Sequence, residues 1–152
     1  MLNIYVLEDH FIQQNRIEEV IHTILKKNNI KVGDFEVFDK PNQLLDFITE
    51  RGSHQLFFLD IQIKDDTKKG LEVAKQIRKS DPYANIVFFT THSEYLPLTF
   101  QYQLAALDFI DKSLEGEDFQ KRLESIILLT CKKIQSQNPE DAFRIENVKT
   151  VI

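Results

Sequence analysis

The chain has 152 residues, which is enough for one domain with a full hydrophobic core. Its hydrophobic content of 42% and charged content of 28% are usual for a globular protein, and its formal net charge of -5 argues against a nucleic-acid-binding surface in this segment. The single cysteine, Cys131, excludes an internal disulfide, and the lack of a signal peptide or a long apolar run predicts a cytoplasmic protein with no membrane contact.

Two hydrophobic patterns alternate along the chain. Short apolar runs rich in β-branched and aromatic residues predict strands at 3–7, 35–38, 56–59, 86–90 and 107–110. Apolar stripes with helical spacing begin near Ile17, Leu44, Leu71 and Phe119. This alternation predicts an α/β fold: a doubly wound, five-stranded parallel sheet with flanking helices. The continuously apolar strands 56–59 and 86–89 are expected in the middle of the sheet.

The composition changes near the C-terminal end. Residues 1–135 form the predicted domain, and the polar, proline-containing run 136–142 is typical of a linker. Residues 143–152 alternate as strands do, and a hairpin of that size is not stable alone. They either pack on the domain or begin a second, β-rich domain, and we favour the second alternative.

Carboxylates follow two of the predicted strands. Glu8 and Asp9 come after the first strand, and Asp60 follows the third. Because the carboxyl ends of parallel strands meet at one edge of the sheet, these acids are expected in one crevice. Their mutual repulsion favours a hard cation between them, and Mg²⁺ beside a phosphoryl group suits such ligands.

The next two strands end on a hydroxyl and an ammonium group, those of Thr90 and Lys112. Acids, hydroxyl and lysine in this order indicate a phosphoryl-transfer site. Each residue also has a plainer interpretation: Asp9 or Asp60 could cap a helix, and Lys112 could be a solvated surface lysine. The combination favours the functional interpretation, whereas the loop acids Asp65 and Asp66 are expected to be solvated.

These residues resemble the receiver domain of two-component response regulators, a flavodoxin-like or CheY-like fold. The resemblance covers residues 1–135. It implies that Glu8 and Asp9 are the metal-binding acid pair, Asp60 the phosphoacceptor and Lys112 the phosphoryl-binding lysine. It also matches Thr90 to the strand-ending hydroxyl residue, and Phe109 to the switch aromatic.

Within that family the chain is similar to the AgrA/ComE-like regulators, through residues 58–61, the loop 64–69 before Gly70, and residues 106–109. Those proteins join a receiver to a LytTR-type DNA-binding domain and respond to peptide pheromones in quorum sensing. The resemblance implies a sensor histidine kinase as partner, a homodimer on phosphorylation, and DNA binding only through a domain absent from this chain. Residues 143–152 are similar to the first strands of a truncated LytTR domain.

The implied mechanism is attack by Asp60 on a phosphoryl group carried by a kinase histidine. Mg²⁺ would be held by Asp9, Asp60 and the backbone carbonyl of Gln62, with Glu8 behind. Lys112 and Thr90 would then bind the phosphoryl product, and Phe109 would move into the vacated space.

The sequence departs from the usual receiver pattern at two positions. Ser113 follows the lysine where proline is usual, so the turn there is expected to be looser or to hold a trans peptide bond. Thr91 stands where alanine or glycine is commoner, and its bulk could slow hydrolysis of the acyl phosphate.

Two other function classes fit parts of the pattern. A Mg²⁺-dependent phosphatase-like hydrolase could use Asp60 as a nucleophile, but such enzymes need an acid two residues later, where this chain has Gln62. A receiver-like module that works without phosphorylation would be expected to have lost an acid or the lysine, and this chain keeps them. We therefore expect a regulatory protein and not an enzyme.

Overall fold

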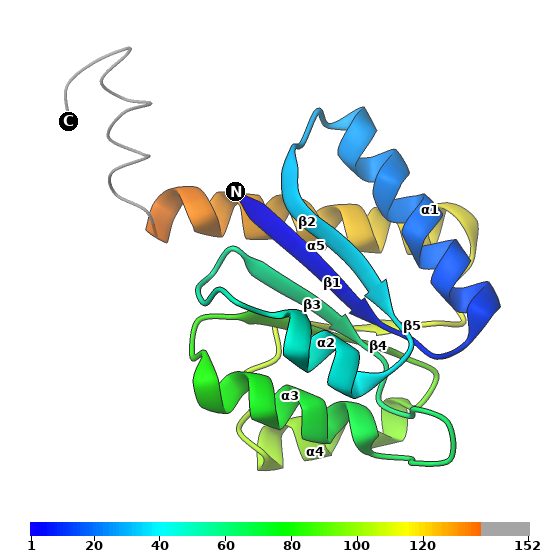
Figure 1. The fold of residues 1–152 in the computed structure, drawn as a ribbon. Helices are drawn as coiled ribbons and strands as arrows, with labels where there is room; N and C mark the ends of the chain where they lie inside the picture. The colour runs from blue at the N-terminus through cyan, green and yellow to red at the C-terminus, as the bar shows by residue number, and fades with distance from the viewer. Residues whose placement is uncertain (138–152) are drawn as a thin grey trace.

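The computed structural model describes residues 1–137 of the chain. The elements, in chain order, are β1 (Leu2–Leu7), α1 (Phe11–Lys27), β2 (Val32–Phe38), α2 (Pro41–Phe47), β3 (Gln55–Leu59), α3 (Lys69–Ser80), β4 (Asn85–Thr90), the 3₁₀ helix η1 (Ser93–Tyr95), α4 (Leu96–Gln101), β5 (Asp108–Asp111) and α5 (Gly116–Gln137). All neighbouring strands of the sheet are parallel, in the order β2-β1-β3-β4-β5. The predicted doubly wound α/β sheet is therefore confirmed (Figure 1).

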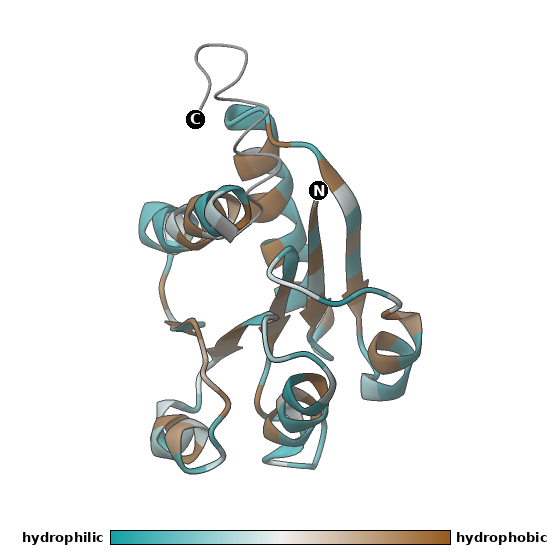
Figure 2. Cartoon of the chain, turned by 90° about the vertical axis from the view of Figure 1, so that its left-hand side faces the viewer, coloured by the Kyte–Doolittle hydropathy of each residue, from teal (hydrophilic) through white to brown (hydrophobic). Residues whose placement is uncertain are grey.

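Helices cover both faces of the sheet. α1 and α5 lie on one face, and α2, α3 and α4 lie on the other (Figures 1 and 2). Alternate residues of a strand point to opposite faces, so Ile4 and Val6 of β1 pack toward α1 and α5 while Tyr5 and Leu7 pack toward α2 and α3. The sheet is thus buried between two hydrophobic layers.

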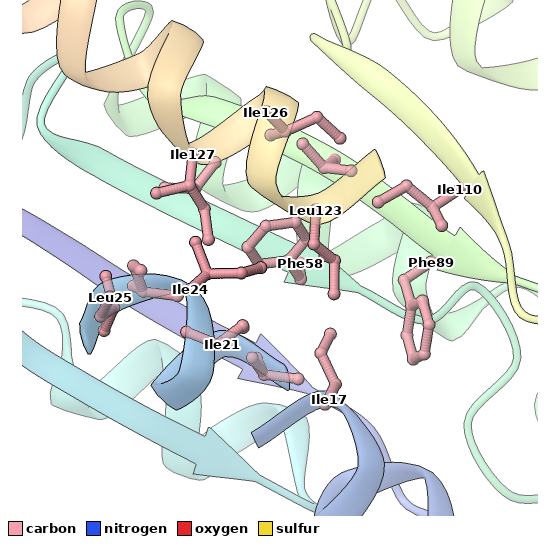
Figure 3. Close-up of a cluster of buried hydrophobic side chains, with 14 of the residues drawn as sticks. Ile17, Ile21, Ile24, Leu25, Phe58, Phe89, Ile110, Leu123, Ile126 and Ile127 are labelled. Atoms are coloured by element: carbon pink, nitrogen blue, oxygen red, sulfur yellow. The ribbon is translucent and has the colours of Figure 1, made fainter. Parts of the chain in front are cut away.

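The layer beneath α1 and α5 is built by the two helical stripes that the sequence predicted. Ile17, Ile21 and Ile24 of α1 and Leu123 and Ile127 of α5 meet over the sheet and are fully or almost fully buried (Figure 3). Residues spaced three or four apart share one face of a helix, which is why these side chains converge. This packing fixes α1 and α5 side by side, next to the loops at the carboxyl edge of the sheet.

The interior strands are those with the most continuous apolar sequence. β1, β3 and β4 are buried along their whole length, whereas the edge strands β2 and β5 are only partly buried. Strands 56–59 and 86–89 were expected in the middle of the sheet, and they form most of the interior strands β3 and β4.

At its C-terminal end α5 includes Ser136 and Gln137, so the helix extends two residues into the range predicted to be a linker. The remainder of that range, 138–142, and the predicted second domain at 143–152 lie outside the described residues. Within residues 1–137, no helix is both long and apolar enough to cross a membrane.

Candidate functional site

The carboxyl edge of the sheet brings the predicted acids and the lysine together. Leu7 of β1 is paired with Leu59 of β3, and the Asp60 N–H donates to the Leu7 carbonyl at 3.0 Å. The next residues along the two strands, Glu8 and Asp60, are therefore neighbours. Thr90 is paired with Asp111, and this pairing places Lys112 at the same edge. Four strand ends thus contribute to one site.

Glu8, Asp9 and Asp60 form an acidic cluster. Each offers a carboxylate oxygen, and the three oxygens lie within 4.8 Å of one another. Glu8 is fully buried and Asp60 is 4% exposed, while Asp9 lies nearer to solvent. Three carboxylates at this separation repel one another, and a bound cation would relieve the repulsion.

Lys112 lies among these acids. Its Nζ donates to Asp60 Oδ2 at 2.5 Å and forms an ion pair with Glu8 Oε1, and its side chain is only 9% exposed. Burial raises the pKa of Glu8, and the hydrogen bond from Lys112 only partly opposes this effect. The ammonium group thus offsets part of the acidic charge where a cation would otherwise be needed.

The second carboxylate oxygen of Asp60 is different. Asp60 Oδ1 is buried and accepts no hydrogen bond from any of the described residues. A buried carboxylate oxygen without a partner costs free energy, and such atoms in folded proteins usually have a ligand or a functional role. Glu8 Oε1 also lacks a hydrogen-bond partner, but it forms the ion pair with Lys112.

A pocket of about 330 Å³ opens over the cluster and gives access to it. It is lined by Glu8, Asp9, His10, Gln13, Asp60, Gln62, Lys64, Thr91, His92 and Lys112. The predicted metal ligands and the lysine therefore share one solvent-accessible pocket. The loop acids Asp65 and Asp66, which were expected to be solvated, are exposed and are not part of the acidic cluster.

The two threonines differ in position. Thr91 is exposed and lines the pocket, whereas Thr90 is fully buried, and its Oγ1 accepts a hydrogen bond from the His92 N–H at 3.1 Å. The Thr90 hydroxyl therefore lies behind the pocket wall in this conformation.

Phe109 lies away from the pocket, on the face formed by α4 and β5. It packs on Phe88 with ring centroids 6.3 Å apart and lines a cavity of about 540 Å³ beside Leu96 and Phe100 of α4. The structure thus separates the predicted switch aromatic from the acids and places it on a partly apolar face.

Two contacts at the site were not foreseen. The Lys64 N–H donates to Asp9 Oδ2 at 2.7 Å, so Asp9 holds the loop after β3 and does not cap α1. Gly70 packs so closely on Asp60 that a Cβ there would overlap the Asp60 carbonyl group. Gly70, at the start of the third helical stripe, was a sequence signal for its close contact with Asp60. Nothing in the sequence indicated the hydrogen bond between Lys64 and Asp9.

Comparison with known proteins agrees with this geometry. The model of the response regulator receiver domain family matches residues 4–124. Accessory gene regulator protein A of Staphylococcus epidermidis is 35% identical over 116 residues, which are 76% of this chain and 48% of that protein. The Staphylococcus aureus protein of the same name is 33% identical over the same shares of each chain. The chain spans about half the length of these curated relatives.

Solved receiver structures share the fold. A response regulator receiver domain protein from Clostridium thermocellum superposes with a TM-score of 0.68 at 14% identity, over 90% of this chain and 99% of that one. The non-phosphorylated HemR receiver domain from Leptospira biflexa gives 0.66 at 20% identity, over 84% and 94%. With the family model matching most of the chain, we conclude that this chain belongs to the response regulator receiver domain family and is related to the accessory gene regulator A proteins.

Proposed function

We propose that Asp60 accepts a phosphoryl group from a phosphohistidine of a sensor histidine kinase. The main support for the proposal is that the two oxygens of the Asp60 carboxylate have different surroundings. One oxygen is held by Lys112, and the other is buried without a partner beneath an open pocket. A carboxylate that is fixed in this way and accessible from one side is suited to act as a nucleophile.

In the proposed step an Asp60 oxygen attacks phosphorus, the phosphorus–nitrogen bond to the kinase histidine breaks, and an acyl phosphate forms. The departing imidazole nitrogen takes up a proton. Lys112, already in contact with Asp60, would remain beside the new phosphoryl oxygens and balance their charge.

The residues fit Mg²⁺. Asp9 and Asp60 offer carboxylate oxygens, the backbone carbonyl of Gln62 is the proposed third protein ligand, and Glu8 lies behind them. The unpaired Asp60 Oδ1 is the kind of hard oxygen atom that Mg²⁺ prefers. When bound, the ion would supply positive charge that offsets the charge on the transferring phosphoryl oxygens.

The proposed output is a movement of the loop after β4. Thr90 would have to leave its hydrogen bond with the His92 N–H to reach the phosphoryl group, with Thr91 at the pocket wall. Phe109 would then repack beside α4, and the α4–β5 face would become a homodimer interface. The relation to accessory gene regulator A proteins supports a role in peptide-pheromone sensing, with DNA bound by a LytTR-type domain of which residues 143–152 would be the start.

A hydrolase is less well supported. The residue two positions after Asp60 is Gln62, whose side-chain amide donates to the Lys64 carbonyl at 3.2 Å and lies at the pocket. An amide cannot act as a general acid at neutral pH. We therefore propose a regulatory role in the cytoplasm, where the kinase would phosphorylate it.

The experiment is intact-mass measurement after incubation with acetyl phosphate and Mg²⁺. Wild type is expected to gain one phosphate, and Asp60→Ala none. Asp65→Ala, which removes an exposed acid five residues away, is the matched control and is expected to be labelled normally. Addition of a chelator should stop labelling of wild type. Equal labelling of Asp60→Ala and wild type would overturn the proposal.

A further inference from the structure

Lys112 is held at its backbone as well as at its ammonium group. Its N–H donates to the Thr90 carbonyl at 3.1 Å, which ties it to β4. Its carbonyl accepts a hydrogen bond from Arg16 Nη1 at 2.8 Å. Since Arg16 belongs to α1, the residue proposed to bind the phosphoryl group is fixed between two elements that are far apart in the sequence.

Arg16 makes a three-part contact around the loop after β5. Besides the Lys112 carbonyl, its guanidinium group donates through Nη2 to the Leu114 carbonyl. The same group lies 3.8 Å from the centroid of the Phe119 ring on α5. A planar guanidinium group holds its donors in a fixed fork, so Nη1 and Nη2 can each reach one carbonyl while the plane lies against the ring.

The loop needs such support. Ser113 follows Lys112, so no proline ring restricts the backbone at that position. Two local contacts are present: the Ser113 N–H donates to Asp111 Oδ1 at 2.8 Å, and the Leu114 N–H donates to the Asp111 carbonyl at 3.2 Å. The two carbonyls on either side of Ser113 both accept from Arg16. The guanidinium group therefore ties this turn to α1, which the local contacts do not do.

Among the described residues Arg16 has no carboxylate in direct contact, although the charge of Glu115 acts on it from a distance. Within residues 1–137 it forms no ion pair with a carboxylate, and its side chain is partly buried. Its Nη1 also donates to Gln13 Oε1 at 3.4 Å, but its two shorter hydrogen bonds go to backbone carbonyls of the loop after β5 and hold the geometry of that backbone. From these contacts we infer that Arg16 is a positioning residue that sets the direction of Lys112 toward Asp60, an inference that rests on the proposed function.

The test compares Arg16→Met with Arg122→Met. Methionine keeps much of the apolar stem and removes all five donors together with the guanidinium contact to Phe119. Arg122 is the matched control because its Nη2 also donates to a backbone carbonyl of β5, that of Phe109 at 3.1 Å, three residues from Lys112. In metal-free protein we expect amide exchange of the Lys112 N–H to quicken about tenfold in Arg16→Met, and to change less than about twofold in Arg122→Met.

Labelling and metal binding provide the second readout. We expect the initial rate of labelling by acetyl phosphate to fall about tenfold in Arg16→Met, because a displaced catalytic group costs that much or more. Mg²⁺ affinity, measured separately by titration calorimetry, should stay within about twofold of wild type because the acids are untouched. Arg16→Lys should also stay well below the wild-type rate, since lysine lacks the fixed fork in which Nη1 and Nη2 each reach one carbonyl.

Several results would overturn the inference: unchanged Lys112 exchange, an unchanged labelling rate, full recovery of the rate in Arg16→Lys, or a Mg²⁺ affinity that falls in step with the rate. The last result would mean that Arg16 only stabilises the fold. Failure of the proposed function would look different, because wild type itself would then take up no phosphate. The exchange measurement still tests the contact to Lys112 in that case.

Discussion

At the scale of single residues, Glu8 is the most deeply buried acid of the site. It is fully buried, and burial raises its pKa in spite of the contact with Lys112. The folded protein therefore holds a proton on Glu8 at pH values where the unfolded chain has lost it. Its stabilising contribution is fully present below the unfolded pKa and is lost as pH rises through the raised folded pKa.

This gives a prediction for Glu8→Gln, which cannot titrate. In metal-free protein, the free energy of unfolding of Glu8→Gln relative to wild type should increase as pH rises above about 4.5, the ordinary glutamate range. Carboxyl groups whose pKa values are lowered, such as Asp111 and Glu124, change the stability at lower pH. They are present in both proteins, so their effect cancels in the comparison. Urea unfolding at several pH values in the presence of a chelator checks this. If the free energy of unfolding of wild type instead increased relative to that of Glu8→Gln as pH rises, the ion pair with Lys112 would be the dominant effect.

Much of the site could be predicted because it lies at strand ends. Acids, hydroxyl and lysine that follow apolar strands point to one edge of a parallel sheet whatever the details of packing. Arg16 and Lys64 could not be found in this way. Arg16 reaches a loop almost a hundred positions later, and the Lys64 contact uses a backbone N–H that any residue carries. Such contacts depend on how α1 and the β3–α3 loop approach their neighbours.

At the scale of elements, every strand except the edge strand β2 was predicted within one residue at each end. β1, β3 and β4 match the predicted runs within one residue at each end, since buried strands need continuous apolar sequence. β2 starts three residues before the predicted 35–38, because an edge strand can pair through residues with little apolar character. α4 has only six residues and shows no stripe long enough to be recognised.

The junction of β3 and α3 depends on Gly70. The Gly70 N–H donates to the Ile61 carbonyl at 2.7 Å, and a Cβ at this position would overlap the backbone of Asp60. We predict that Gly70→Ala lowers the free energy of unfolding by about 2–3 kcal/mol, as overpacking does, and reduces phosphate labelling. Gly116→Ala is the control: its φ of 53° is strained for alanine but its Cβ would meet no atom within 4 Å. It should cost about 1 kcal/mol and leave labelling intact. Chemical denaturation of both variants decides the comparison.

The face formed by α4 and β5 is the predicted dimer interface. Phe100 is 76% exposed beside the cavity that Phe109 lines, and an exposed aromatic group next to an apolar cavity is typical of an interaction surface. Beryllofluoride with Mg²⁺, a mimic of phosphorylated Asp60, should shift wild type from monomer toward dimer in analytical ultracentrifugation.

Phe100→Ser should remain monomeric under those conditions and still accept phosphate from acetyl phosphate. Phe11→Ser removes an equally exposed aromatic side chain from α1, on the opposite face of the sheet, and should dimerise as wild type does. Dimerisation of Phe100→Ser at wild-type strength would place the interface elsewhere.

At the scale of the whole molecule, charge limits what this polypeptide can bind. It carries 24 acidic and 19 basic side chains, and affinity for duplex DNA comes largely from several lysine or arginine contacts to phosphates. We predict that the 152-residue polypeptide shows no retention in a gel-shift titration at physiological salt, with or without phosphate on Asp60. Sequence-specific retention would mean that the DNA-binding function lies within these residues.

The proposed phosphoacceptor is Asp60 itself. Borohydride reduces an aspartyl phosphate to homoserine, which peptide mapping by mass spectrometry then locates in the chain. After treatment with acetyl phosphate and Mg²⁺, we predict homoserine at position 60 and at no other acid, and none when the metal is chelated. Homoserine at Asp9 or Asp65, or a protein that has gained phosphate but yields no homoserine, would contradict the assignment.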